Sequence, residues 1–565
     1  MCCATAIGID WTHPAFGGFQ KVPNQKVVFA VSYTGEPQKD NFGHGSHCAG
    51  IAAGDLYMGT ARGDSQIQGV APRAQLMSYK VLSAMGSGTA AAIILAIEDA
   101  VQRGAHVINL SLGEAMGDPN SPEAVAVNNA ILAGTIVCCA AGNSGPGEGT
   151  VGSPGSADLV ITVGASTDDS VTATYARAVG VRQKREVETR LLHGSAPLHD
   201  PAWSLGYVQC GLGRDAGDFP DQAFGRIALI QRGGVPFRQK AKAAEAAGAL
   251  AAVIVNNTTG NFWGTLGDAT PNDPQPAIPV LSIAQEDGEY LLRLGFDQSG
   301  ISRAPLQLDP ARVPIPDRLA EFSSRGPNQD GAIKPELCAP GVNIFSATIL
   351  AGPFPGVPNM ADPSGYTVAS GTSMATPHMA GAAALLRQLH PEWSPAFVKA
   401  ALVNTAVWMQ GQGGATEQGN GRLDLRAAAG VPALLVADAQ PVQPTLSFGT
   451  VDHQGELTSL VQGLRLIDLA GSGGGYTLHA HMATRVRGLS VAVSRKQVTL
   501  PQGCGASLQL TLTLDGQSLA DGAYYGFVTA TGQGTTLRLP FFLSTTGAAP
   551  TGTGINAHVS SVVTA

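Results

Sequence analysis

Charged residues are few in this 565-residue sequence: Asp, Glu, Lys and Arg together make up 13%, and the formal net charge is -8. The chain has no basic run or stripe, so we predict no nucleic-acid partner. No apolar run reaches the roughly 18 residues that a membrane-spanning helix needs. The first residues, MCCATAIGID, lack a basic stretch followed by an apolar one, so we predict no signal peptide in this chain.

Cysteine is also scarce, with eight residues in the whole chain, which is too few for a disulfide scaffold. Cys48, Cys138 and Cys139 fall in apolar stretches, and we expect them to be small buried side chains. No group of residues has the spacing of metal ligands, so we predict no metal in the chemistry. Hydrophobic residues make up 44%, enough for large cores in roughly three or four domains.

Short apolar runs alternate with amphipathic ones between residues 26 and 170. The predicted strands cover 26–33, 106–113, 135–143 and 160–166, and the predicted helices cover 89–105 and 121–134. Strands that alternate with helices favour a parallel sheet with helices on both faces. This part of the chain is therefore predicted to be an α/β domain.

The alternation changes at about residue 171 and resumes near 319, so we predict an inserted domain between two parts of one α/β domain. The middle contains a compact unit of mixed strands and a helix, predicted over 226–233, 237–249, 250–257 and 277–283. After 433 only strand patterns remain, including Leu508, Leu510, Leu512 and Leu514 on one face, which predicts an antiparallel β-sandwich. The predicted parts are 1–170, 171–316, 317–432, 433–546 and a flexible tail at 547–565.

Three short segments carry side chains suited to nucleophilic catalysis. His44 lies among small residues in NFGHGSHCAG, where a loop enters a helix, and Asn143 lies in CAAGNSGPG at the end of a strand. Ser373 opens a long apolar helix in GTSMATPHMAG, with Pro377 expected in the first turn of that helix. Taken one at a time, a structural His, a helix N-cap Ser and a turn Asn are open alternatives.

In this order and with these neighbours, the three segments resemble the subtilisin-like serine proteases, the subtilase or peptidase S8 family. HGSHCAG is similar to the His motif, GTSMATPHMAG to the Ser motif and AAGNSGP to the oxyanion-hole motif of that family. FSSRGPN, KPELCAPG and QGNGRLDLRAA are similar to further segments of it. The resemblance covers residues 8–170 and 317–430. It implies a subtilisin-like parallel sheet flanked by helices.

The resemblance also implies roles for individual residues. Ser373 would attack the scissile carbonyl, His44 would take its proton and pass it to the leaving amine, and Asn143 would stabilise the oxyanion. The segment Ser111, Leu112 and Gly113 would pair with the substrate backbone. His47 and His378 match positions that are structural in the family. The implied activity is that of a serine endopeptidase, EC 3.4.21.-, acting on proteins or peptides. The resemblance gives no oligomeric state.

Other implications concern the remaining domains and the setting. The inserted unit resembles a protease-associated (PA) domain, in which Val235 stands where a Cys is common, so Cys210 is expected to lack a disulfide partner. The C-terminal sandwich resembles a fibronectin-type module. Relatives of this kind are extracellular, and no cofactor is required for the chemistry. Structural calcium is common in the family, although the sequence shows no ligand cluster.

The catalytic acid of the family is missing. The acid-bearing strand there typically reads Asp-Thr-Gly-Ile-Asp, then two residues, then His-Pro, and GIDWTHPAF (8–16) matches it from the Gly onward. Aligning Gly8 places the acid at position 6, which is Ala6. Asp10 lies four residues further on, on the order of 13 Å along extended chain, and is a poor substitute. Asp40, just before the His motif, is a poorer one.

Two hypotheses follow from Ala6. In the first, the chain is an endopeptidase by descent whose N-terminal part is truncated, through a misplaced start, a frameshift or a deletion. In the second, it is a catalytically impaired relative whose cleft binds peptides without efficient cleavage. An α/β-hydrolase is excluded because its nucleophile lies in G-x-S-x-G ahead of the acid and the His, whereas here the His precedes the Ser.

Overall fold

The computed structural model describes residues 2–6, 8–58, 66–181, 185–198, 202–258, 260–266, 274–352, 359–453 and 455–546. The chain forms two compact units. One unit contains Met1–Ser166 and Ser323–Ala565, and the other contains Thr167–Phe322. The second unit is therefore an insertion in the first along the sequence.

The first unit is built on a parallel sheet of seven strands within the described residues. In spatial order they are β17 (Leu337–Pro340), β8 (Ile161–Ser166), β7 (Ile136–Ala140), β6 (Val107–Leu110), β1 (Cys2–Ala6), β5 (Leu76–Lys80) and β2 (Val27–Ser32). The middle strands β5 to β8 are buried along their whole length, as expected for a sheet covered on both faces.

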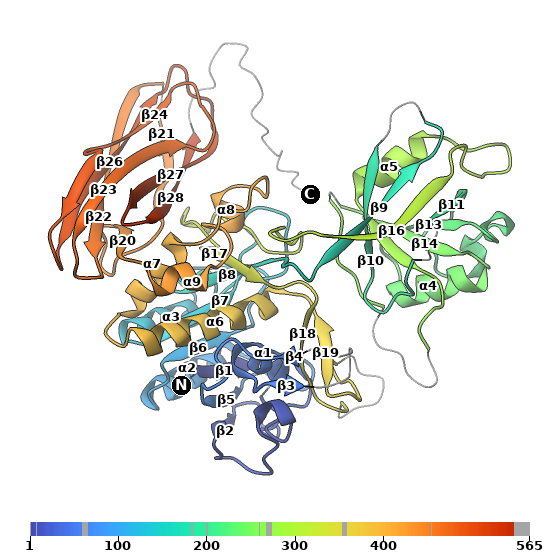
Figure 1. Ribbon diagram of the computed structural model, residues 1–565, viewed down its shortest axis with the longest axis horizontal. Helices are drawn as coiled ribbons and strands as arrows, with labels where there is room; N and C mark the ends of the chain where they lie inside the picture. Colours follow the sequence, from blue (N-terminus) through green and yellow to red (C-terminus); the bar gives the residue numbers. More distant parts are fainter. Residues whose placement is uncertain are drawn as a thin grey trace. The chain divides into compact units, whose positions relative to one another are not determined.

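Helices cover both faces of this sheet, which confirms the predicted α/β class (Figure 1). Helices α2 (Ala90–Gln102) and α3 (Pro122–Leu132) pack over one face, on a core that includes Tyr79, Ile108 and Leu110. On the other face lie α1 (His44–Ala53) and α6 (Thr372–Leu389), which pack against each other.

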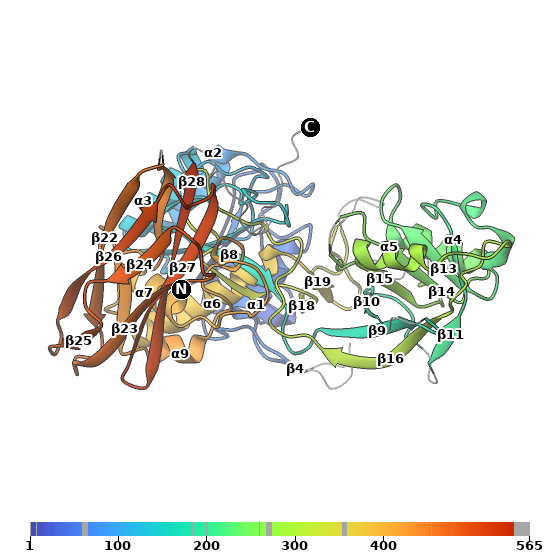
Figure 2. The ribbon, with the colours of Figure 1, turned by 90° about the horizontal axis from the view of Figure 1, so that it is seen from above.

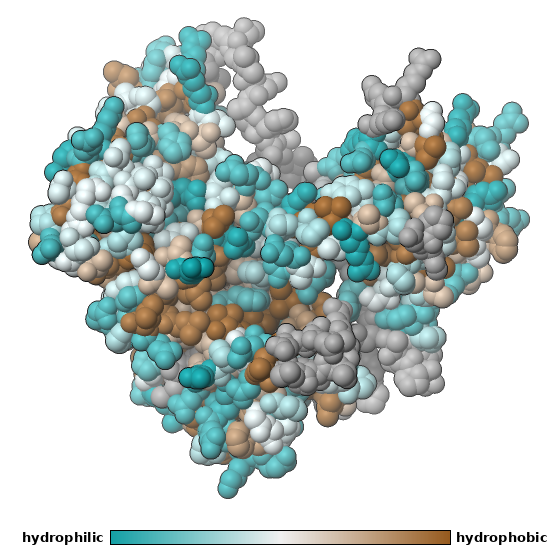
Figure 3. Space-filling view, in the orientation of Figure 1, coloured by the Kyte–Doolittle hydropathy of each residue, from teal (hydrophilic) through white to brown (hydrophobic). Residues whose placement is uncertain are grey.

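Helix α6 is apolar over most of its length, and its first half is almost entirely buried. On the face of the molecule drawn in Figure 3, apolar residues gather in a band across the region where α6 lies. The chain continues through α7 (Pro395–Asn404), α8 (Ala415–Gln418) and α9 (Leu425–Ala429). Two short hairpins complete this part: β3 (Tyr57–Met58) with β4 (Gln66–Ile67), and β18 (Ile344–Ala347) with β19 (Tyr366–Ala369).

The C-terminal part of the same unit is the predicted β-sandwich (Figure 2). One sheet contains β20 (Ala433–Ala437), β22 (Leu457–Asp468), β26 (Gly505–Asp515) and β24 (Leu489–Val493). The other contains β21 (Leu446–Asp452), β28 (Thr535–Thr546), β27 (Gly522–Gly532), β23 (Gly474–Met482) and β25 (Gln497–Leu500). Leu508, Leu510, Leu512 and Leu514 are all buried, as their alternation predicts. The expected purely antiparallel pairing is wrong at one place, because β21 and β28 pair in parallel.

Polar contacts join the sandwich to the α/β part. The guanidinium of Arg538, on β28, donates to the side chain of Asn420 at 2.7 Å and to the carbonyl of Ala406 at 2.7 Å. It also lies 5.6 Å from the ring centroid of Trp408. Asn404 binds both Leu435 and the backbone of Arg538. These contacts explain why the sandwich and the α/β part form one compact unit.

The second unit contains one mixed sheet of eight strands in its described part. The order is β11 (Trp203–Leu205), β16 (Leu306–Pro314), β9 (Thr172–Ala178), β10 (Glu186–Leu191), β15 (Val280–Ile283), β14 (Ala251–Val255), β13 (Ile227–Gln231) and β12 (Tyr207–Gln209). Strands β12 to β15 are parallel and the others antiparallel. Helices α4 (Phe237–Ala246) and α5 (Gln285–Arg293) contribute to separate hydrophobic clusters, α4 through Ala241 and Ala244 and α5 through Leu291. Figure 2 shows β9 and β16 extending beyond the part that α5 covers.

The cysteines that the sequence singled out are buried. Cys48, Cys138 and Cys139 are completely buried, as their apolar neighbours predict. Cys210 is buried and is not in a disulfide. Across the described ranges, no helix has the length and apolar character to cross a membrane.

Candidate active site

His44 is the first residue of α1, and the start of this helix is fixed by Asp40. One carboxylate oxygen of Asp40 accepts from the backbone N–H groups of Phe42 and Gly43, both at 2.9 Å. The other accepts from the N–H of Ser46 at 2.8 Å and from its hydroxyl at 2.7 Å. Asp40 therefore binds one free N–H group in the first turn of α1, that of Ser46, and two N–H groups of the loop just before it. Both of its carboxylate oxygens are occupied by these contacts.

The start of α1 also lies very close to the chain segment that follows β1. A Cβ on Gly45 would come within 1.9 Å of the carbonyl oxygen of Gly8, so only a glycine allows this approach. His44 is thereby held next to the end of β1. Its ring is half-buried, and burial lowers the pKa of His44 to about 4. Cys48, one turn further along α1, has its Sγ 3.9 Å from His44 Nδ1 and 4.0 Å from Nε2.

Ser373 is the second residue of α6, and the prediction that Pro377 lies in the first turn is wrong. Helix α6 begins at Thr372, so Pro377 is its sixth residue and lies inside the helix. Proline has no N–H, so the carbonyl of Ser373 receives no helical hydrogen bond from residue 377. That carbonyl accepts instead from the hydroxyl of Ser111 at 2.8 Å and from the thiol of Cys48 at 3.3 Å. The Ser373 hydroxyl donates to the Ser111 carbonyl at 3.4 Å.

Asn143 is held by the residue that precedes Ser373. The side-chain oxygen of Asn143 accepts from the N–H of Thr372 at 2.9 Å and from its hydroxyl at 3.0 Å. A Cβ built on Gly371 would lie 3.5 Å from Asn143 Nδ2 and 3.6 Å from the Ser373 backbone nitrogen. The two nitrogens therefore lie close to the same point beside Gly371. Both can donate hydrogen bonds, which a developing oxyanion requires.

Ser111, Leu112 and Gly113 continue the chain beyond the end of β6. Ser111 is buried and accepts a hydrogen bond from the Asn109 side chain at 3.0 Å. Leu112 is half-buried, and Gly113 is exposed. A Cβ on Gly113 would come within 2.9 Å of the Ser153 carbonyl, so this segment passes close to the loop that carries Ser153. The structure thus brings His44, Asn143, Ser373 and Ser111 into one region.

The register of the sheet places position 6 in the same region. In β1, Ala6 is aligned with Lys80 of β5, and Thr5 is aligned with Leu110 of β6, one residue before Ser111. Tyr79 and Leu110 belong to the core under α2 and α3. Lys80, the register partner of Ala6, binds the side chain of Asn41 just before α1. The strand β1 also packs against α1, which begins at His44.

Asp10, the other acid weighed in the sequence, is engaged in a turn. Its carboxylate accepts from the N–H of Thr12 at 3.0 Å and from the hydroxyl of Thr12 at 2.5 Å. It also forms an ion pair with Lys39 at 2.8 Å. Together with the helix-capping role of Asp40, these contacts leave neither acid in the position of a partner for His44.

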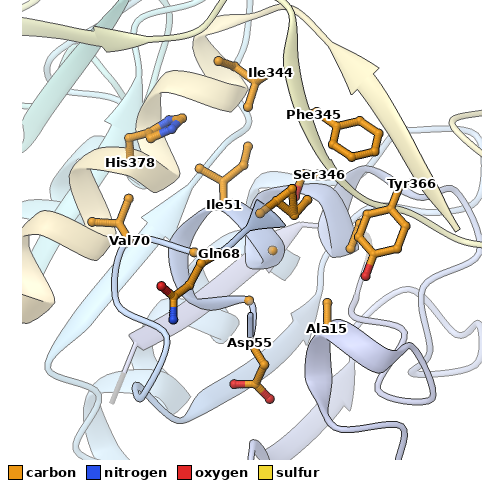
Figure 4. A pocket seen from close by; sticks show the side chains of 15 residues that line it. Ala15, Ile51, Asp55, Gln68, Val70, Ile344, Phe345, Ser346, Tyr366 and His378 are labelled. Atoms are coloured by element: carbon orange, nitrogen blue, oxygen red, sulfur yellow. The ribbon is translucent and has the colours of Figure 1, made fainter. Parts of the chain in front are cut away.

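His47 and His378 make contacts with the backbone of neighbouring elements. His47 is buried, and its Nε2 lies 3.2 Å from the Thr367 carbonyl, while Nδ1 of His378 lies 2.9 Å from the Met374 carbonyl. His378 also lines a cavity beside α1, which Figure 4 shows between Ile51, Tyr366 and the loop of Gln68. None of His44, Asn143 or Ser373 lines that cavity.

The sequence did not indicate a role at the site for Thr372, for Asn109 or for Cys48, which was predicted only to be buried. Thr372 orients Asn143, and Asn109 orients the hydroxyl of Ser111. The adjacency of Thr372 to Ser373 in GTSMA was the available signal for the first. Asn109 gave none, because its partner is evident only once the strand has been placed in the sheet.

Comparisons with known proteins identify relatives of this chain. The sequence model of the Subtilase family matches residues 7–423. The chain is 34% identical over 421 residues to the minor extracellular protease Vpr of Bacillus subtilis (strain 168), covering 72% of this chain and 48% of Vpr. It is 33% identical over 420 residues to the subtilisin-like protease SBT5.4 of Arabidopsis thaliana, covering 68% and 52% respectively.

A third relative, the PII-type proteinase of Lacticaseibacillus paracasei, is 31% identical over 380 residues, which is 61% of this chain and 19% of that protein. The chain spans about half the length of the first two relatives. The family match covers most of the chain and includes the segments that carry His44, Asn143 and Ser373. The chain belongs to the subtilase family of serine proteases.

Proposed function

We propose that this chain is a serine endopeptidase of the subtilisin type whose turnover is severely reduced by Ala6. The observation that carries the proposal is the position of Ser373 beside the amide of Asn143, with the Cys48 thiol in contact with both the Ser373 carbonyl and the ring of His44. Ser373 Oγ attacks the substrate carbonyl, and His44 accepts the proton that Oγ loses. The same proton then passes to the leaving amine as the C–N bond breaks, and water hydrolyses the acyl-enzyme.

Each of the other groups has a defined part in this proposal. Asn143 Nδ2 and the Ser373 N–H stabilise the negative charge on the carbonyl oxygen of the tetrahedral intermediate. The exposed backbone of Gly113, with Leu112 and Ser111, pairs with an extended substrate chain. The substrates are proteins or peptides, and the setting is extracellular, in keeping with the name of Vpr. The unit Thr167–Phe322 is proposed to be a PA-type domain and the sandwich a fibronectin-type module.

Ala6 also favours a second function, in which the cleft binds peptides and cleaves them very slowly. A triad aspartate orients the imidazole and stabilises the imidazolium, and Ala6 does neither. Residual catalysis of roughly 10³–10⁴ over water can still come from the oxyanion hole and from binding. The two functions therefore differ in rate and share one site.

A serine-directed fluorophosphonate tests the proposal, with hydrolysis of a peptide substrate measured beside it. We expect labelling and turnover in the Ala6→Asp variant, and loss of both when Ser373→Ala is added. The unmodified chain, with Ala6, is expected to label far more slowly. Labelling that persists in the double variant, or an Ala6→Asp chain that neither labels nor cleaves, would contradict the proposed function.

Replacement of Asn143 by Ala in the Ala6→Asp background is expected to lower kcat about 10²–10³-fold, the loss measured for this donor in a subtilisin. KM should change little, because the oxyanion exists only in the transition state and its intermediate. Steady-state kinetics on one peptide substrate provide the measurement. Asn128→Ala, on α3, is the control. A loss confined to KM would contradict the role of Asn143.

The acid limb of the pH profile should reveal the missing carboxylate. Activity requires neutral His44, so kcat/KM falls as the pH drops through the His44 pKa, which burial lowers to about 4 in the present chain. A carboxylate beside the ring favours the imidazolium and raises that pKa by roughly one to three pH units. We therefore expect the acid limb near pH 4 in the unmodified chain and at a clearly higher pH in Ala6→Asp. Ala6→Asn, which adds no charge, should keep the acid limb near pH 4. Acid limbs at the same pH in the unmodified chain, Ala6→Asp and Ala6→Asn would contradict this account.

A further inference from the structure

Ser373 is attached to the rest of the site through its own backbone carbonyl. Pro377 leaves that carbonyl without its helical donor, and two side chains from other elements donate to it. The hydroxyl of Ser111 does so at 2.8 Å and the thiol of Cys48 at 3.3 Å. The oxygen of one residue therefore joins α6 to the end of β6 and to α1.

The hydroxyl of Ser111 has a fixed direction. It is buried, and it accepts from Asn109 Nδ2 at 3.0 Å, so its single proton is available for the Ser373 carbonyl. Asn109 is itself buried, on β6. Ser111 also contacts Ser373 a second time, because its carbonyl accepts from the Ser373 hydroxyl at 3.4 Å. Two hydrogen bonds between the same two residues restrain both the backbone and the Oγ of Ser373.

We propose that the Ser111 side chain is a positioning residue, which holds the nucleophile by donating to the carbonyl that Pro377 leaves free. This role is separate from the pairing of the Ser111–Gly113 backbone with substrate, and it rests on the proposed function. Displacement of a reacting atom by about 1 Å can lower a rate by 10²-fold, so one hydrogen bond to the residue that carries Oγ has a large effect.

Kinetics in the Ala6→Asp background test the positioning. Ser111→Ala is expected to lower kcat roughly 10–100-fold while KM changes little, because the backbone that binds substrate is retained. Ser78→Ala is the matched control. Ser78 is a buried serine on β5 whose hydroxyl has no hydrogen-bond partner in the described part of the chain. Its loss should change kcat by no more than about twofold.

A double-variant cycle with Pro377→Ala measures the contribution of the hydrogen bond between the Ser111 hydroxyl and the Ser373 carbonyl. Alanine at 377 supplies an N–H that can bond to the Ser373 carbonyl within α6, so the Ser111 hydroxyl becomes partly redundant. In urea unfolding of Ser373→Ala protein, Ser111→Ala should lower the folding equilibrium constant about tenfold with Pro377 present. With Ala at position 377, Ser111→Ala should lower the folding equilibrium constant by less than about threefold.

Two results would overturn the proposal. One is a kcat for Ser111→Ala that equals that of Ser78→Ala, and the other is an equal effect of Ser111→Ala with and without Pro377. Failure of the proposed function is distinguishable, because an inactive Ala6→Asp chain contradicts the protease assignment while the unfolding cycle still reports on the contact between Ser111 and the residue 373 carbonyl.

Discussion

Ala6→Asp is expected to raise kcat roughly 10⁴-fold, because loss of the corresponding aspartate alone from a subtilisin lowers kcat by about 3 × 10⁴. The sheet register is the structural reason. Position 6 is aligned with Lys80 on one side, and its neighbour Thr5 is aligned with Leu110 on the other. The strand that carries position 6 packs against α1, which begins at His44, and against α6, which carries Ser373.

Single-turnover and steady-state hydrolysis of one peptide substrate measure this gain. Ala6→Asn is the matched control, since it has nearly the shape of Asp and cannot stabilise an imidazolium. It should recover far less of the rate, as it does when the triad aspartate of another serine protease becomes Asn. A gain of less than tenfold with Asp, or an equal gain with Asn, would show that the carboxylate at position 6 is not what the site lacks.

Asp10→Asn should leave the rate of Ala6→Asp within about threefold, because Asp10 binds Thr12 and Lys39.

Much of the α/β core could be predicted from periodicity and length. The apolar run 135–143 became β7, which ends at Ala140, because the next residues leave the sheet to form the loop that carries Asn143. The alternation of Leu508 to Leu514 gave the correct buried face of β26. Local pattern suffices for such elements, since burial on one face or on both determines the sequence directly.

Contacts between distant segments could not be predicted in the same way. Asn143 and Thr372 are 229 residues apart, and their hydrogen bond decides which way the amide points. The parallel pairing of β21 with β28 depends on how the chain returns between two sheets, which strand propensity does not encode. Pro377 lies in the second turn of α6 and not in the first, although the predicted helix start at Ser373 is only one residue from the observed one. Its effect on the Ser373 carbonyl depends on the distant Ser111, which donates to that carbonyl.

The segment KPELCAPG was noted only as a family resemblance, yet it contains a buried ionic cluster. One oxygen of Glu336 accepts from Lys334 Nζ and from Lys399 Nζ, both at 2.7 Å, and the other accepts from the Thr162 N–H at 2.8 Å. All three charged side chains are at most 3% exposed. Lys334 also donates to the Ala157 carbonyl at 2.7 Å. The cluster therefore joins β17, β8 and α7 in the core of the first unit.

Glu336→Gln is expected to lower the free energy of unfolding by about 3–5 kcal/mol at pH 7, because it leaves two buried ammonium groups without a counter-charge. Urea unfolding in the Ser373→Ala background measures the loss, and Asp99→Asn, which removes a surface pair with Arg103, should cost under about 1 kcal/mol.

Burial lowers the pKa of Lys399 to about 8 despite Glu336. Between that value and the unfolded value of 10.5 the unfolded chain binds more protons, so this group makes stability rise with pH. Without Glu336 the pKa of Lys399 falls further, which widens that window, so the loss should be smaller at pH 10 than at pH 7. An equal loss at both pH values would mean that the amide disrupts packing and that uncompensated charge is not the cause.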